Sequence, residues 1–146
     1  MTKADADTPP RDDLAVTTAF VIALAATLGA LFIGEVLGQM PCTLCWYQRI
    51  AMFPLAFILT VGLFPLDVRC VRYALPIALA GWAIALYHCL LYLGVIPESL
   101  QPCTQGASCA DVKIELVGFV TIPLLSLLGF TLIISLLLAV RKGIKQ

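Results

Sequence analysis

Four long apolar runs dominate this chain of 146 residues and constrain its fold more than any other feature. A helix needs about 20 apolar residues to cross a bilayer. The runs are Leu14–Leu37, a stretch from near Pro41 to Phe64, Tyr73–Leu93 and Leu116–Val140. Apolar residues make up 61% of the chain and charged residues 12%, whereas a soluble domain has about 45–50% and about 25%. The sequence therefore predicts an all-α integral membrane protein, a bundle of four transmembrane helices.

The predicted organisation is one membrane domain between two short tails. Residues 14–142 form the four-helix domain, and residues 143–146 form a cytoplasmic C-terminal tail. Residues 1–13 are acidic and contain two prolines, so we expect a disordered cytoplasmic tail. A cleaved signal peptide is the alternative for the first run, but the acidic flank and the length of the run disfavour it.

Lysine and arginine flank the predicted spans unequally, and cytoplasmic loops of membrane proteins carry the excess. Seven lie on one face, namely Lys3, Arg11, Arg69, Arg72, Arg141, Lys142 and Lys145, against Arg49 and Lys113 on the other. Both termini are therefore predicted to be cytoplasmic, and the short loops 38–49 and 94–115 extracytoplasmic. The formal net charge of +0 offers no basic field for nucleic acid, so that class of partner is excluded.

Four of the six cysteines fall in the predicted extracytoplasmic loops. Cys42 and Cys45 form a C-x-x-C motif where the second helix is expected to begin, and a helix N-terminus lowers the pKa of such thiols. Cys103 and Cys109 enclose a short loop that would be a weak structural staple. An exposed disulfide of this kind is easily attacked by a thiolate, which suits an exchangeable bond.

Two other interpretations of the four sulfurs remain open, a pair of inert structural bridges and a zinc site. Cys70 lies in a predicted cytoplasmic turn and Cys89 inside the third span, and neither is assigned a role.

Three ionisable residues near the same membrane face are further candidates. Arg49 follows Cys45 by four residues, so a helix places both on one face, although an arginine there also suits a lipid anchor. His88 is the single histidine, and Glu35 ends the first span. Ionisable groups within a membrane are functional candidates by default, whereas a buried histidine is also common in packing and a carboxylate can simply reach water.

The string Met40-Pro-Cys-Thr-Leu-Cys-Trp-Tyr-Gln-Arg49, with four spans and a second outer cysteine pair, closely resembles the DsbB family of quinone-linked disulfide-generating membrane proteins. The resemblance runs from about Leu14 to Lys142. The short spacing of the second pair, Tyr87-His88 and Phe119-Val-Thr-Ile-Pro123 are most similar to the compact BdbC type.

The resemblance implies an oxidoreductase of the bacterial cell membrane that reoxidises a DsbA- or BdbD-like thioredoxin-fold dithiol protein. It implies that the Cys103–Cys109 disulfide is attacked by this partner and that electrons pass to Cys42 and then Cys45. Which of Cys103 and Cys109 is attacked first stays open. Cys45, Arg49 and His88 are implied to contact a quinone, either ubiquinone or menaquinone, whose species the residues do not specify.

Two alternative functions are consistent with the residues. One is a thiol and quinone oxidoreductase similar to vitamin K epoxide reductase, which also has four spans and a C-x-x-C motif. In that family the motif lies near the outer end of a late span, whereas here it opens the second. The other is a small non-catalytic scaffold whose loops are held by two structural disulfides.

Overall fold

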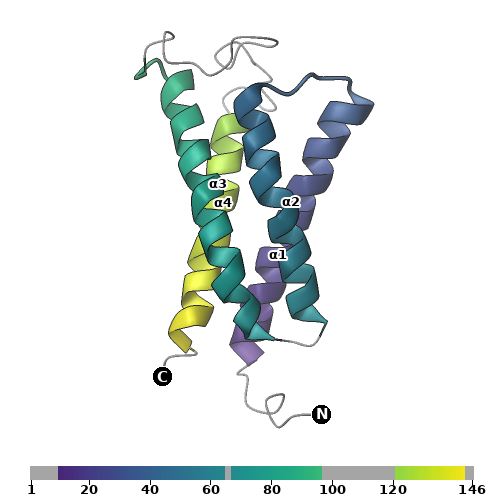
Figure 1. Ribbon diagram of the computed structural model, residues 1–146, viewed down its shortest axis with the longest axis vertical. Helices are drawn as coiled ribbons and strands as arrows, with labels where there is room; N and C mark the ends of the chain where they lie inside the picture. Colours follow the sequence, from purple (N-terminus) through teal and green to yellow (C-terminus); the bar gives the residue numbers. More distant parts are fainter. Residues whose placement is uncertain (1–9, 65–66, 97–120, 144–146) are drawn as a thin grey trace.

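The computed structural model describes residues 10–64, 67–96 and 121–143, and within these ranges the chain is all-helical. The long helices are α1 (Pro10–Leu31), α2 (Thr43–Leu63), α3 (Val71–Tyr92) and α4 (Ile122–Gly143) (Figure 1). A five-residue π-helix (Phe32–Val36) continues α1, and a short 3-10 helix (Val68–Cys70) precedes α3. Four helices are long and apolar enough to cross a membrane, so the predicted fold class is confirmed.

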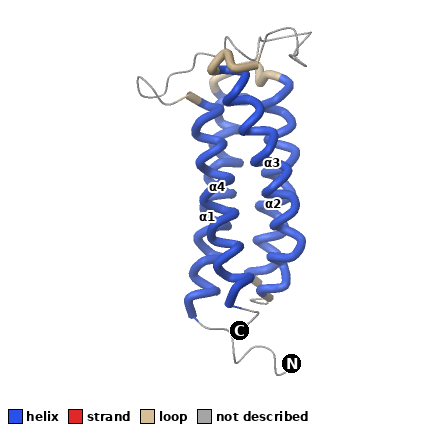
Figure 2. The backbone as a smooth tube through the Cα atoms, turned by 90° about the vertical axis from the view of Figure 1, so that its left-hand side faces the viewer, coloured by secondary structure: helices blue, strands red, loops and turns tan. Residues whose placement is uncertain are grey.

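The four helices form a ring in chain order. α1 packs against α2 and α4, and α3 packs against the same two helices from the opposite side. α1 begins and α4 ends at the lower end of Figure 1, whereas α2 begins and α3 ends at the upper end. The tube view shows all four running along the long axis of the bundle (Figure 2). The start of α2, where the C-x-x-C motif lies, is therefore at the end of the bundle opposite to the start of α1.

The first helix begins earlier than its apolar run. Residues 10–13, predicted as part of the tail, form the first turn of α1. Proline suits the first helical position because its missing N–H needs no partner there, and Asp12 and Asp13 interact favourably with the helix N-terminus. The predicted disorder therefore does not extend over these residues, and residues 1–9 lie outside the described part of the chain.

The fourth helix begins at Ile122, later than the Leu116 predicted from the apolar run. Thr121 is not helical, and the residues before it lie outside the described ranges. Pro123 falls in the first turn of α4, where a helix tolerates the absent N–H. Arg141 and Lys142 lie in its last turn, a favourable position for cations.

The buried core of the described bundle consists mostly of aliphatic side chains around the Phe130 ring, with Phe20, Phe53 and Trp82 partly buried against it. The largest fully buried side chains of this core are Phe130, Leu55, Leu59, Ile133 and Leu137. Gly81 on α3 allows α3 and α4 to approach closely, because a Cβ added there would collide with the Phe130 ring and lie 3.0 Å from the Cβ of Ala51.

We expect Gly81→Ala to lower the free energy of unfolding by about 1–3 kcal/mol, the usual cost of overpacking a core. Thermal unfolding in detergent, followed by circular dichroism, measures the change. Gly29→Ala is the matched control, because a Cβ on Gly29 meets nothing within 4 Å. If both variants unfold like the wild type, the close approach at Gly81 does not limit packing.

Candidate active site

The two cysteines of the C-x-x-C motif lie at the opening of α2. Cys42 is the N-cap, with extended backbone angles (φ −66°, ψ 165°), and its Sγ accepts a hydrogen bond from the backbone N–H of Cys45 at 3.3 Å. The two Sγ atoms are 2.8 Å apart. The helix starts at Thr43, two residues after the predicted Pro41, and the sulfur of Cys42 takes the place of the usual capping oxygen.

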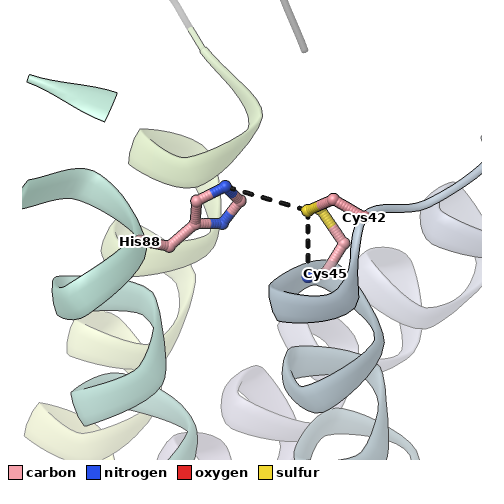
Figure 3. Close-up of side chains that lie close together, drawn as sticks. All are labelled: Cys42, Cys45 and His88. Atoms are coloured by element: carbon pink, nitrogen blue, oxygen red, sulfur yellow. Dashed lines mark hydrogen bonds between the residues drawn. The ribbon is translucent and has the colours of Figure 1, made fainter. Parts of the chain in front are cut away.

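His88 on the neighbouring helix α3 points toward this dithiol (Figure 3). Its Nε2 is 3.9 Å from the Sγ of Cys42, and its Nδ1 is 3.1 Å from the side-chain nitrogen of Gln48. His88 is 1% exposed and Gln48 is 6% exposed. Buried polar groups need hydrogen-bond partners, so this contact orients both side chains.

The orientation of the Gln48 amide favours one tautomer of the His88 ring. The amide nitrogen can only donate, so Nδ1 accepts and the ring proton lies on Nε2. Nε2–H then points at Cys42, where it can donate to a thiolate. Gln48 is therefore a positioning residue for His88, and His88 is a donor to the reactive sulfur.

The dithiol carries its negative charge on Cys42. The hydrogen bond between the two side chains is the main reason that the pKa of Cys42 falls to about 4. Burial opposes the shift, while His88 and the backbone N–H of Cys45 support it. The first proton therefore leaves the reduced pair at acidic pH, and the pair holds a thiolate at neutral pH.

We expect His88→Ala to raise the apparent pKa of the Cys42 thiolate by about one unit, because a hydrogen bond to a charged group is worth about 1.5–3 kcal/mol and this one is long. The lowered pKa stabilises the folded reduced form above the ordinary thiol pKa. This stabilisation is lost as the pH falls through about 4. The rate of alkylation by iodoacetamide as a function of pH, measured in a Cys70→Ser/Cys89→Ser/Cys103→Ser/Cys109→Ser background, reports the midpoint. An unchanged midpoint in the His88 variant would show that His88 does not stabilise the thiolate.

A cavity of about 300 Å³ lies next to the dithiol, between α1, α2 and α4. Its walls are mostly aliphatic or small residues, among them Ala26, Gly29, Ile33, Met52, Leu125 and Gly129. Three polar side chains of α2 also line it: Cys45, Gln48 and Arg49. The cavity is therefore an apolar space with a sulfur and a cation on one wall.

Arg49 is held in place by contacts to α1 and to its own helix. Its guanidinium donates a 2.6 Å hydrogen bond to the backbone carbonyl of Ala30, and it lies over the Trp46 ring, 5.4 Å from the centroid. A Cβ on Gly34, in the π-helix, would lie 3.1 Å from both terminal nitrogens of Arg49. Glycine at this position leaves room for the guanidinium beside α1.

The structure brings together four of the residues that the sequence singles out. Cys42, Cys45 and His88 form one cluster, and Arg49 shares the cavity wall with Cys45. His88 is not among the described residues that line this cavity. Cys103 and Cys109 lie outside the described residues.

The remaining candidates lie elsewhere. Glu35 is exposed, in the π-helix. Cys70 packs against Gly62, Cys89 is buried in α3, and both are free thiols.

Gln48 is a further residue of the site that the sequence patterns did not single out. It follows Cys45 by three residues, which places it on the same helical face, and it is one of two buried polar side chains in the described core. A glutamine that shares a helical face with a reactive cysteine was the available signal.

A four-helix membrane bundle with a close pair of cysteines at a helix opening is the arrangement of a membrane thiol–disulfide oxidoreductase. A family model described as disulfide bond formation protein DsbB matches residues 12–140. The chain therefore belongs to the DsbB family, and it takes part in disulfide bond formation at the membrane.

Individual relatives agree with this assignment. The chain is 48% identical over 124 residues to a probable disulfide formation protein of Metapseudomonas resinovorans, covering 84% of this chain and 86% of the relative. It is 41% identical over 127 residues to disulfide bond formation protein C of Bacillus subtilis (strain 168), covering 87% and 91%. No solved structure matches the chain.

Proposed function

We propose that this protein reoxidises an extracytoplasmic thioredoxin-fold dithiol oxidase and passes the electrons to membrane quinone, so that exported proteins acquire disulfide bonds. The observation that carries the proposal is the position of the C-x-x-C pair. Cys42 is held as a thiolate beside His88, while Cys45 lines an apolar cavity within the bundle. One dithiol thus connects a site for thiol exchange with a site for an apolar electron acceptor.

The cavity suits the head group of a quinone. Such a ring is flat and largely apolar, with two carbonyl oxygens that accept hydrogen bonds, and ligand pockets are typically apolar with a few polar groups. Arg49 is a donor on the wall, and Cys45 lies on the same wall. The small residues Gly29 and Gly129 leave open space where a Cβ would stand. A bound quinone would accept two electrons and two protons as the Cys42–Cys45 dithiol becomes a disulfide.

In the proposed relay each sulfur of this chain has one role. The partner attacks the Cys103–Cys109 disulfide and leaves it reduced. A thiolate of that loop then attacks Cys42 of the Cys42–Cys45 disulfide, and Cys45 departs as the leaving group on the cavity wall. The other loop cysteine next attacks the loop sulfur of this mixed disulfide, which restores the Cys103–Cys109 disulfide and leaves Cys42 and Cys45 as a reduced dithiol. Either Cys103 or Cys109 can be the sulfur that the partner attacks.

The surrounding residues support these steps. His88 donates to the sulfur of Cys42, which stabilises a charge on that sulfur whenever the pair is reduced. Arg49 places a positive charge near Cys45 and offers N–H groups to a carbonyl oxygen in the cavity.

The proposed sidedness follows from the charge distribution. Arg141 and Lys142 lie in the last turn of α4, at the end of the bundle where α1 begins. Arg69 lies in the 3-10 helix before α3, and Arg72 lies in the first turn of α3. Because the cytoplasmic ends of membrane helices carry the excess of lysine and arginine, this end is proposed to face the cytoplasm, and the dithiol to face the oxidising side.

Quinone reduction by the purified protein in detergent tests the proposal directly. The donor is a reduced thioredoxin-fold dithiol protein, and either a ubiquinone or a menaquinone analogue is the acceptor. We expect turnover with the wild type that disappears in Cys45→Ser. A folded wild type that reduces neither quinone would overturn the proposal and favour a scaffold with inert disulfides.

A further inference from the structure

The reduced dithiol and His88 have the composition of a metal site. The Sγ atoms of Cys42 and Cys45 and a ring nitrogen of His88 lie within 4.8 Å of one another. Thiolate and imidazole are the ligands that zinc prefers, and three protein ligands with one open position are a common zinc arrangement. We propose that the reduced form of this protein binds a zinc ion through Cys42, Cys45 and His88, and that the bound ion arrests the relay.

The distances are close to those that a zinc ion requires. Zn–S bonds of about 2.3 Å and Zn–N bonds of about 2.0–2.1 Å in a tetrahedron separate two sulfurs by about 3.7 Å and a sulfur and a nitrogen by about 3.5 Å. The structure has 2.8 Å between the sulfurs and 3.9 Å between Cys42 Sγ and His88 Nε2. The two sulfurs must separate by about 1 Å, which a change in the side-chain torsion of Cys45 at the helix opening can provide.

Gln48 supplies the second interaction that metal-bound histidines nearly always have. A ligating histidine usually donates its other ring N–H to a carbonyl or carboxylate oxygen. Gln48 contacts Nδ1 of His88 at 3.1 Å, and a half-turn of its amide presents the oxygen instead of the nitrogen. The ring proton then moves from Nε2 to Nδ1, and the lone pair of Nε2 can bind the ion.

The binding step changes no oxidation state. Two sulfur–zinc bonds and one nitrogen–zinc bond form, the thiol proton of Cys45 leaves to solvent, and both sulfurs remain reduced. A disulfide cannot bind in this way, so the site exists only in the reduced form. A zinc-bound pair cannot become a disulfide, so the bound ion stops turnover. The arrest of turnover rests on the proposed function, whereas zinc binding does not depend on it.

Cobalt titration of the reduced protein tests the site without any turnover. The protein carries Cys70→Ser, Cys89→Ser, Cys103→Ser and Cys109→Ser, so that Cys42 and Cys45 are its only thiols. We expect thiolate-to-cobalt charge-transfer bands with tetrahedral visible bands, saturating at about one ion per chain and abolished by zinc. The same protein with its pair oxidised should show none of these bands.

Two variants distinguish the three-ligand site from a C-x-x-C pair acting alone. His88→Ala should weaken cobalt binding by at least about 100-fold, and Gln48→Leu by about 10-fold, the effect of removing a partner of a ligating histidine. Circular dichroism confirms that each variant is folded. Undiminished binding in His88→Ala, or no charge-transfer bands in the reduced parent, would overturn the proposal.

Inhibition of turnover is measured separately in the otherwise wild-type chain. We expect zinc to inhibit quinone reduction in the wild type and a chelator to restore it. Cobalt bands without any quinone reduction, with or without zinc, would refute the proposed function and leave the metal site intact. Turnover without cobalt bands would refute the metal site and leave the function intact.

Discussion

Replacing either Cys42 or Cys45 by serine should lower quinone reduction by at least about 1000-fold while leaving the protein folded. A dithiol delivers two electrons only by forming a bond between its sulfurs, which are 2.8 Å apart in the reduced pair. A single thiol can exchange once and then stops as a mixed disulfide. Loss of a residue that forms covalent bonds in a catalytic cycle commonly costs several orders of magnitude in rate.

The two variants should fail at different points. In Cys45→Ser, Cys42 keeps its contact with His88 and should accumulate as a mixed disulfide with the loop pair, visible as a shift on a non-reducing gel. In Cys42→Ser, Cys45 still lines the cavity, but the sulfur of Cys42, through which electrons reach it, is missing. Identical trapped species from both variants would contradict the division of roles between Cys42 and Cys45.

Cys70→Ser/Cys89→Ser is the matched control. Both residues are free thiols, one packed against Gly62 near the turn before α3 and the other buried in α3. Neither belongs to the cluster of Cys42, Cys45 and His88. We expect turnover within about twofold of the wild type, because neither sulfur takes part in the proposed exchange and a residue that makes no interaction in the transition state does not change kcat/KM. A large loss in this variant would mean that the relay contains a further cysteine.

The fold was predictable from the sequence because each span is a long apolar run between charged or turn residues. The ends of the helices were less predictable, since they depend on capping and not on hydropathy. Pro10 and the aspartates after it extend α1 by one turn beyond the apolar run. The π-helix after Leu31 was not predicted from hydropathy, and its Gly34 lies against the guanidinium of Arg49, a contact between two separate helices.

The site was predictable where the chemistry depends on local spacing. The C-x-x-C motif and the following arginine lie on one helix, so their relation follows from the helical repeat. The contact between His88 and Cys42 joins residues 46 positions apart and depends on how α2 and α3 pack. The helical repeat places Gln48 on the face of Cys45, but its contact with the His88 ring could not be predicted, because it depends on how α2 and α3 pack.

Replacing Arg49 by methionine should raise the KM for quinone by about 10- to 100-fold with a smaller change in kcat. The guanidinium lines the cavity beside Cys45, and a hydrogen bond from a charged donor is worth about 1.5–3 kcal/mol, where 1.4 kcal/mol corresponds to a factor of ten. Methionine keeps much of the apolar volume of the side chain. Steady-state kinetics at saturating dithiol donor, with quinone as the varied substrate, measure the change.

Two further variants separate this role from that of a lipid anchor. Arg49→Lys keeps the charge but loses the planar fork of donors, so it should recover part of the quinone affinity. Gly34→Ala leaves Arg49 in the chain but places a Cβ 3.1 Å from both terminal nitrogens, which should displace the guanidinium and raise the KM by a smaller factor. An anchor that only reaches the membrane surface would change thermal stability and leave the KM unaltered. Unchanged quinone kinetics in Arg49→Met, with the thiolate of Cys42 still titrating near pH 4, would therefore remove Arg49 from the acceptor site and leave the dithiol chemistry standing.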